Sequence, residues 1–361
     1  MSFAEKPQTS PDLSAQITSW QVITVVTFNV WFGLRERGVL RMKPLESRER
    51  RERRYRILLG ELRQRQPDFI ALQEANPVRR YARRLAADLG YDEIHQVYNG
   101  GVKIGPAGIP INLQMGLVLL AKRQFQLRWA GSRQISGDRL GIYHDNLCLH
   151  FTDSRFVMAG SASIGGKRLF LVHTHTYAGP SQHPEIFDLL RRCREQGEIT
   201  EGGYQNHVSR LERIACRQHD EIDRILHFLR STCGDHPAVL LGDFNLSEDD
   251  PILVHLIKEG HLWDTYQIAN PDKKGDTWDS TSNENTAFFG GLVSERSDTM
   301  DIRSRLRAEY DRISRRIDYI FLNSVFRKDQ ILESSLVFEH AVDGLHASDH
   351  YGVMTRVRIE S

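Results

Sequence analysis

Leu240-Leu241-Gly242-Asp243-Phe244-Asn245 closes an apolar run that begins at Ala238. The run predicts a buried strand that stops at the glycine. Because side chains alternate along an extended segment, we expect Asp243 and Asn245 to project from the same side of the strand end. A carboxylate beside a neutral amide can direct a water molecule at a phosphate, since the acid accepts the proton and the amide donates hydrogen bonds. The stretch therefore points to hydrolysis at a strand end.

Polar residues stand at the ends of several other apolar runs. Besides Asp243 and Asn245 these residues are Asn29, Glu74, His173, His175 and Asp318, and a further cluster, Ser348-Asp349-His350, lies near the C-terminus. Any one of them taken alone is as well explained by a satisfied structural role. Their joint placement at strand ends predicts an acidic pocket with one or two imidazoles. Such a pocket favours metal-assisted hydrolysis of a phosphoester.

Strand and helix patterns alternate along the chain. They predict strands at residues 22–29, 69–72, 117–121, 155–162, 168–173, 237–241, 316–322 and 351–359, and helices at residues 46–66, 77–89, 204–231 and 302–313. The alternation predicts α/β layers. No shift in composition marks a boundary, so we expect a single catalytic domain over residues 21–361 behind a loose lead-in over residues 1–20. Loop insertions are expected near residues 100–110, 179–203 and 270–299.

The charge balance excludes some partners. The 361 residues include 48 basic and 47 acidic ones, so the formal net charge is +1. This balance predicts no global attraction to nucleic acid or to an anionic membrane, although a local patch can still bind phosphate. No apolar run is long enough to span a bilayer, and the N-terminus lacks the apolar centre of a secretory signal. We therefore expect a cytoplasmic protein, or a nuclear one if the source is eukaryotic.

The four cysteines, Cys148, Cys193, Cys216 and Cys233, are widely separated. None forms a C-x-x-C pair, so the sequence indicates neither a zinc site built on cysteines nor a disulfide framework. We expect buried or half-buried free thiols.

Six short motifs occur in a fixed order over residues 22–358. They are Thr27-Phe28-Asn29, Leu72-Gln73-Glu74, Thr174-His175-Thr176, Gly242-Asp243-Phe244-Asn245, Arg316-Ile317-Asp318-Tyr319-Ile320 and Ser348-Asp349-His350. This ordered set resembles the endonuclease/exonuclease/phosphatase superfamily, whose fold is DNase I-like. The resemblance implies a four-layered α/β sandwich, in which two packed, mostly antiparallel sheets lie between helices. It also implies that the catalytic residues gather at one edge.

The resemblance further implies a divalent cation and an activated water. Glu74 and Asp349 would be ligands of Mg²⁺, a hard cation that prefers oxygen, with Mn²⁺ as a substitute. Asn29 would support the metal or its water shell. Asp243 would orient and deprotonate the attacking water, and Asn245 would hold that water or a phosphate oxygen. The number of metal ions stays open.

Three further residues have implied roles around the phosphate. His350 would donate to a non-bridging oxygen as charge accumulates there. Asp318 would pair with His175 and fix its tautomer, whereas Asp349 is not assumed to orient the neighbouring His350. Because His173 and His175 alternate, both would face the same side of a regular strand. The motif favours His175 as the functional one. For His173 a supporting or substrate-contacting role stays open, and a packed core histidine is the favoured interpretation.

Two features are similar to the tyrosyl-DNA phosphodiesterase 2 branch of the superfamily. They are Asn29-Val30-Trp31-Phe32 in the first motif and Trp278-Asp279-Ser280-Thr281-Ser282-Asn283 in the polar stretch after residue 270. The likeness implies a nucleic-acid substrate or a 5′-phosphotyrosyl adduct of DNA, with Trp278 and Asn283 in contact with the strand. Equally, Trp278 can simply pin a long loop to the body. Trp31 stands where the animal-type members of the branch have an acid, and His175-Thr176-Tyr177 replaces the branch's His-Leu-Glu motif, so the substrate stays open.

Two other functions are compatible with the same motifs. A neutral sphingomyelinase-like or phosphoinositide-type enzyme would act on lipid headgroups, and the apolar residues 288–293 are a candidate for lipid contact, although packing on the core is the more common role of such a segment. A non-catalytic interaction module would be expected to have lost catalytic positions, but all of them are present. No obligate protein partner is evident.

The densest basic run, residues 47–56, alternates arginines with Glu49 and Glu52. Arginines on a helix can follow a phosphate backbone. The interleaved acids favour a solvated face in which Glu and Arg pair with each other.

Overall fold

The computed structural model describes residues 20–31, 46–99, 102–104, 107–109, 115–137, 147–148, 154–180, 183–287 and 301–360. Two six-stranded sheets form its centre. The first has the order β14 (Ile331–Val337), β15 (Gly352–Glu360), β1 (Trp20–Asn29), β2 (Phe69–Ala75), β6 (Met115–Lys122) and β3 (Tyr91–Asn99). The second has the order β12 (Leu262–Asp264), β13 (Asp318–Asn323), β11 (Ala238–Asp243), β10 (Lys167–His175), β9 (Arg155–Ile164) and β7 (Arg128–Ser136).

Strand pairing in both sheets is mostly antiparallel. The parallel pairs among the described strands are β1 with β2 and β10 with β11. In the second of these pairs His175 lies opposite Asp243, and across the antiparallel neighbour Asp243 lies opposite Asp318. Register therefore aligns three of the polar strand ends within one sheet. A small third sheet has the order β5 (Ala107–Ile109), β4 (Val102–Ile104) and β8 (Leu147–Cys148).

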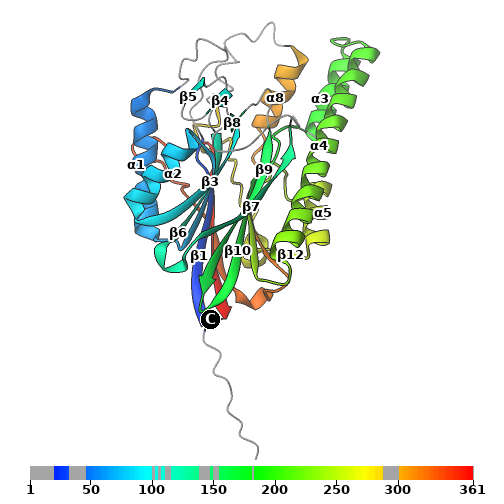
Figure 1. The fold of residues 1–361 in the computed structure, drawn as a ribbon. Helices are drawn as coiled ribbons and strands as arrows, with labels where there is room; N and C mark the ends of the chain where they lie inside the picture. Colours follow the sequence, from blue (N-terminus) through cyan, green and yellow to red (C-terminus); the bar gives the residue numbers. More distant parts are fainter. Residues whose placement is uncertain are drawn as a thin grey trace, which may run out of the picture.

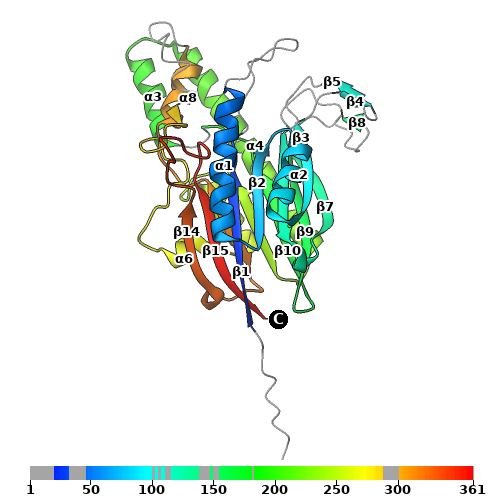
Figure 2. The same cartoon turned by 90° about the vertical axis from the view of Figure 1, so that its left-hand side faces the viewer.

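Helices cover the two outer faces of the sandwich, as Figure 1 shows. Figure 2 looks onto α1 (Arg48–Arg65) and α2 (Val78–Leu89), which cover the first sheet. The second sheet is covered by α4 (Glu201–Cys233) and α5 (Pro251–Gly260). The other helices of the described residues are α3 (Pro184–Glu195), α6 (Thr265–Ala269), α8 (Ile302–Asp311) and the 3₁₀ turns η1 (Arg123–Phe125) and η3 (Lys328–Gln330). The four expected layers are present.

Alternation along each strand divides its side chains between two cores. In β1, Ile23 and Val25 pack between the sheets, whereas Val26 and Phe28 pack under α1 and α2. In β11, Val239 and Leu241 face the other sheet, whereas Leu240 packs under α4 and α5. Asn29 and Asp243 continue the inward-facing rows of these strands. The polar strand ends therefore stand at the edge of the core between the sheets.

Local signals explain where the helices begin and end. The Oγ of Ser47 accepts a hydrogen bond from the Arg50 amide at the start of α1, and Gln66 ends that helix in a left-handed conformation. The long helix α4 begins after Thr200, whose hydroxyl accepts from the Gly203 amide, and ends before Gly234. Both helices agree with the sequence predictions to within three residues at each end.

The sequence predictions missed several elements. The strands β3, β7, β12 and β14 and the helices α5 and α6 were not expected, and helix α3 lies inside the predicted insertion at residues 179–203. Pro184 starts α3 at its first turn, where proline is favoured, although the surrounding Gly and Pro residues suggested a loop. The predicted loop at 100–110 contains β4 and β5. Cys193 and Cys233 are buried free thiols as expected, but Cys216 is exposed.

Two predictions fall largely outside the described residues: the lead-in over residues 1–20, of which Trp20 alone is described and begins β1, and the candidate lipid contact at 288–293. Among the described residues, no helix combines the length and the apolar character that crossing a bilayer requires.

Candidate active site

A polar layer replaces the apolar core just below the strand ends. Gln73 in β2 donates from Nε2 to the hydroxyl of Thr27 at 2.9 Å, and the same nitrogen lies 2.6 Å from Nε2 of His173. All three residues are fully buried. Burial lowers the pKa of His173 to about 3, so its ring is neutral and can accept this hydrogen bond. His173 is therefore a core histidine, as expected.

Asp243 is at the centre of the next layer. One carboxylate oxygen, Oδ2, accepts a hydrogen bond from Nδ2 of Asn29 at 3.0 Å and lies 3.4 Å from Nε2 of His175 and 3.9 Å from Nε2 of His350. The other oxygen accepts from the backbone amide of Asn245 at 3.0 Å. Burial and the charge of Asp318 raise the pKa of Asp243 to about 7. The side chain is thus a carboxylate whose basicity is raised toward neutrality.

The turn after β11 differs from the predicted extended segment. Asn245 has a φ of +51°, and its Nδ2 donates to the carbonyl of Thr176 at 3.2 Å. The expectation that Asp243 and Asn245 extend one alternating row is therefore wrong, because the chain turns after Asp243 and the carboxylate caps the turn. Gly242 is required at this place. It has a φ of +146°, and a Cβ there would lie 2.0 Å from the carbonyl oxygen of Thr174 on β10.

Glu74 reaches the site through an irregularity in β2. Phe69 and Ala71 face the core between the sheets, and Gln73 continues their row, so strict alternation would turn Glu74 away from the site. The pairing of β2 with β6 shifts register between Leu72 and Ala75, and Glu74 itself has a φ of +60°. A bulge of this kind re-aims a side chain. As a result, Glu74 Oε1 lies 4.0 Å from Nε2 of His175.

His350 is held by Asp318, and this pairing corrects the expected one. Nδ1 of His350 lies 2.8 Å from Oδ2 of Asp318, whereas the expected partner of Asp318 is His175. Burial alone lowers the pKa of His350, but the charges of Asp318 and Asp243 more than compensate and raise it to about 10. The imidazole is therefore protonated at neutral pH, with Nε2 directed toward Asp243.

His175 has a different partner. Its Nδ1 lies 3.1 Å from the hydroxyl of Tyr98, a buried residue that is not among the candidates predicted from the sequence. Burial lowers the pKa of His175 well below its ordinary value, so the ring is neutral. A hydroxyl donating to Nδ1 leaves the Nε2 proton for Asp243. No sequence motif marked Tyr98, because it lies at the end of the unexpected strand β3.

The loop that carries Ser348, Asp349 and His350 is fixed by hydrogen bonds to β1 and to the stretch after residue 277. The hydroxyl of Ser348 lies 2.6 Å from the carbonyl oxygen of Asn29 and 3.0 Å from Oδ1 of Asp349. The amide of Asn283 donates to the carbonyl of Ser348 at 3.0 Å, and Asn283 is 2% exposed. Asn283 therefore contacts this loop and is almost entirely shielded from solvent.

Trp278 packs against His350. Its ring lies edge-on to His350, with ring centroids 5.3 Å apart and an interplanar angle of 80°. The indole Nε1 donates to the carbonyl of Asp311 at 2.9 Å, and the backbone bridges to Arg315. The residue is 6% exposed. These contacts favour the interpretation in which Trp278 pins its loop and supports His350.

Arg54, from the basic run on α1, binds the backbone of two segments that lie next to the site. Its guanidinium forms a double hydrogen bond with Glu46 and donates to the carbonyls of Val30, Trp31 and Ala347. The side chain is 5% exposed. It joins the segment after Asn29 to the segment before Ser348. The prediction that this run is a solvated, self-paired face is wrong for Arg54, whereas Arg56 is 75% exposed.

The donor set suits a divalent cation. Glu74 is half-buried, and burial together with the charge of Asp349 raises its pKa to about 8; burial also raises the pKa of Asp349. Carboxylates that repel one another in this way are stabilised by a cation between them, and oxygen donors favour Mg²⁺. In the part of the chain that is described, Asp243, Asp318 and His350 also place possible ligand atoms within 4.8 Å of one another.

Three comparisons relate this chain to known proteins. A model of the Endonuclease/Exonuclease/phosphatase family matches residues 26–350. A search of curated proteins by sequence gives no match. Solved structures with a similar fold include humanized D. rerio TDP2, with 15% identity, a TM-score of 0.54 and coverage of 93% of this chain and 98% of that one.

Two further solved structures have a similar fold. D. rerio TDP2 complexed with single strand DNA product has 16% identity to this chain and a TM-score of 0.52. The match covers 94% of this chain and 99% of that one. An endonuclease/exonuclease/phosphatase from Bacteroides vulgatus has 16% identity and a TM-score of 0.56, with coverage of 94% and 100%. At these identities the likeness establishes a shared fold.

Proposed function

Because this chain belongs to the endonuclease/exonuclease/phosphatase family, we propose that it is a Mg²⁺-dependent phosphodiesterase acting on nucleic acid or on a 5′-phosphotyrosyl adduct of DNA. The observation that carries the proposal is the convergence of Asn29, His175, Asp243 and the Asp318–His350 pair at one edge of the core. An acid with raised basicity beside a protonated imidazole is the arrangement that water attack on a phosphate requires.

Asp243 activates the attacking water in the proposed reaction. Asn29 and the Asn245 amide each donate to a different oxygen of this carboxylate, so its orientation is set before substrate arrives. Nε2 of the neutral His175 lies near Oδ2 of Asp243, the same oxygen that accepts the hydrogen bond from Asn29. The carboxylate accepts the proton as the water attacks phosphorus in line with the leaving oxygen. No covalent enzyme intermediate is formed.

His350 stabilises the charge that develops on the phosphate. Asp318 keeps it protonated and fixes Nδ1, which leaves the Nε2 proton for a non-bridging oxygen. Glu74 and Asp349 would hold the Mg²⁺ or Mn²⁺ ion, which would polarise the phosphoryl oxygens. Asn29, whose carbonyl oxygen contacts Ser348, keeps the loop of Asp349 next to the carboxylate layer.

A DNA substrate is favoured by two points. One of the structures that share this fold contains a single strand DNA product, and the first motif of this chain resembles the tyrosyl-DNA phosphodiesterase 2 branch. The lipid alternative depends on residues 288–293, which lie outside the described part of the chain. A module without catalysis is opposed by the assembled site.

The proposal is tested with a panel of substrates. We expect the protein to release tyrosine from a 5′-phosphotyrosyl oligonucleotide in Mg²⁺ or Mn²⁺, and to lose this activity in EDTA. Abasic DNA, RNA, sphingomyelin and phosphoinositides complete the panel. Turnover that persists in EDTA would contradict metal dependence. Release of phosphocholine without turnover of any nucleic acid would replace the substrate proposal by the lipid alternative.

Replacing Asp318 with asparagine tests the corrected pairing. We expect Asp318→Asn to lower kcat by about 10- to 100-fold, the usual cost of removing a group that orients a catalytic side chain. KM should stay within about twofold, because Asp318 does not contact substrate in the proposed reaction. Steady-state kinetics on the phosphotyrosyl oligonucleotide gives both values. An unchanged kcat, with the melting temperature also unchanged, would show that the Asp318–His350 pair is not needed for turnover.

A further inference from the structure

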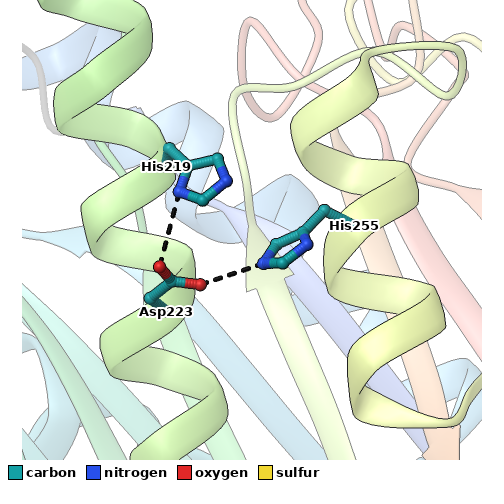
Figure 3. Close-up of side chains that lie close together, drawn as sticks. All are labelled: His219, Asp223 and His255. Carbon is teal, nitrogen blue, oxygen red and sulfur yellow. Dashed lines mark hydrogen bonds and ion pairs between the residues drawn. The ribbon is translucent and has the colours of Figure 1, made fainter.

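A second group of possible metal ligands lies outside the catalytic edge, between α4 and α5. His219 and Asp223 are one helical turn apart on α4, and His255 projects from α5 toward them (Figure 3). Nδ1 of His219 lies 3.4 Å from Oδ2 of Asp223, and Nε2 of His255 lies 2.9 Å from Oδ1. The two imidazole rings are stacked, with centroids 4.7 Å apart and an interplanar angle of 25°. One carboxylate therefore lies between two imidazole nitrogens.

The spacing of these atoms fits a four-coordinate cation. Ligand atoms at about 2.0–2.1 Å from a tetrahedral metal are about 3.3–3.4 Å apart. The separation of His219 from Asp223 is already of this size, and one atom from each of the three residues can be chosen so that all lie within 4.8 Å of one another. Nε2 of His255 lies 2.9 Å from Oδ1 of Asp223, so this pair would have to separate by about 0.4 Å to share one ion. The exposed fractions of 47% for His219 and 32% for His255 leave room for a water as the fourth ligand.

The donor types select the class of metal. Two imidazoles with one carboxylate suit Zn²⁺ and its first-row neighbours, whereas Mg²⁺ prefers oxygen donors alone. This composition differs from the carboxylate-rich catalytic edge, where Glu74 and Asp349 are the proposed ligands. We therefore expect the two sites to bind different cations, because one offers nitrogen and oxygen donors and the other offers oxygen donors.

We propose that His219, Asp223 and His255 form a binding site for a transition-metal dication of the Zn²⁺ class, which ties α4 to α5. The inference rests on these three side chains and is independent of the proposed function.

The proposed metal site joins two helices, α4 and α5, that contact the segments next to the catalytic edge. On the buried face of α4, Gln218 donates to the carbonyl of Tyr177 at 3.0 Å, and Glu221 accepts from the Tyr177 amide at 2.7 Å. Tyr177 follows β10 two residues after His175. Helix α5 begins a few residues after Asn245. A cation that joins the two helices would therefore fix α4, which contacts the end of β10, and α5, which follows the end of β11.

The test is a titration of the full chain with Zn²⁺ in an excess of Mg²⁺. Isothermal calorimetry compares the wild type, the double variant His219→Ala/His255→Ala and the control His340→Ala, which removes an exposed histidine outside the cluster. We expect the double variant to bind one equivalent of Zn²⁺ fewer than the other two proteins. We also expect Zn²⁺ to raise the melting temperature of the wild type and the control but not of the double variant.

Equal Zn²⁺ stoichiometry and equal Zn²⁺-induced melting shifts in all three proteins would overturn the proposal and leave Asp223 as a hydrogen-bonding partner of two histidines only. The double variant should fold, because His219 is exposed, His255 is partly exposed, and ion pairs at the surface contribute little to stability. Melting in EDTA checks this. If it did not fold, His255→Gln would replace it, and unchanged Zn²⁺ affinity in that variant would equally overturn the site.

Discussion

Replacement of Asp243 by asparagine is expected to lower turnover of the phosphotyrosyl oligonucleotide by a factor of about 10³–10⁴, the upper range for loss of a general base. The substitution keeps the size of the side chain and removes its ability to take a proton. We therefore expect the loss to appear in kcat. Steady-state kinetics in saturating Mg²⁺ measures it.

The contacts of Asp243 explain why an amide cannot substitute for the acid. Its two oxygens accept from Nδ2 of Asn29 and from the Asn245 amide. An asparagine has one acceptor oxygen and one NH₂ group, so one of these donors would face another donor. The orientation of the side chain would then change together with its basicity.

Asp235→Asn is a matched control for this variant. Asp235 is an exposed acid in the turn before β11, at the opposite end of the strand from Asp243. We expect wild-type kinetics from it. If Asp243→Asn retained turnover within tenfold of the wild type while folding normally, another group would have to be the base.

Replacement of Arg54 by methionine is expected to lower the free energy of unfolding by about 3–5 kcal/mol, the range observed when one member of a buried ion pair is removed. Among the described residues, the buried Glu46 would keep only the half-exposed Arg50, at 3.3 Å, as an ion-pair partner, and the carbonyls of Val30, Trp31 and Ala347 would lose the hydrogen bonds that Arg54 donates. Chemical denaturation measures the change. Because Arg54 joins the segments next to Asn29 and Ser348, activity should also fall.

Two companion variants show whether the effect comes from the buried pair. Arg56→Met removes an exposed arginine of the same helix and should change stability by less than about 0.5 kcal/mol. Adding Glu46→Gln to Arg54→Met should restore part of the lost stability, because it removes a buried charge that, in the described part of the chain, Arg50 alone is left to balance. Equal effects of Arg54→Met and Arg56→Met would show that α1 carries its arginines only as a solvated face.

Much of the site could be predicted from the sequence because strand alternation is a local property. The apolar residues of the strands that lead to Asn29, His175 and Asp243 determine which face these side chains share, and the strand ends are marked by the change from apolar to polar residues. The order of the six motifs indicated the family, and the family match and the fold confirm it. The helices 46–66 and 204–231 were predictable for the same reason, since the apolar period and the end signals lie within each segment.

The partners of these residues were decided by tertiary structure. The sequence placed Asp318 with His175, yet the loop of residues 348–350 brings His350 to Asp318 instead. Glu74 would face the wrong side without the bulge in β2, and Arg54 differs from its exposed neighbours only in what packs over it.

The spacing of His219 and Asp223 can be read on one helix, but His255 joins them only when α5 packs on α4. Alternation and helical period are set by neighbours in the chain, so the sequence by itself determined the family, the strands that lead to Asn29, Glu74, His175 and Asp243, and the residue types at the candidate site. Pairing depends on contacts between segments far apart in the chain, so only the tertiary structure decided which acid meets which histidine.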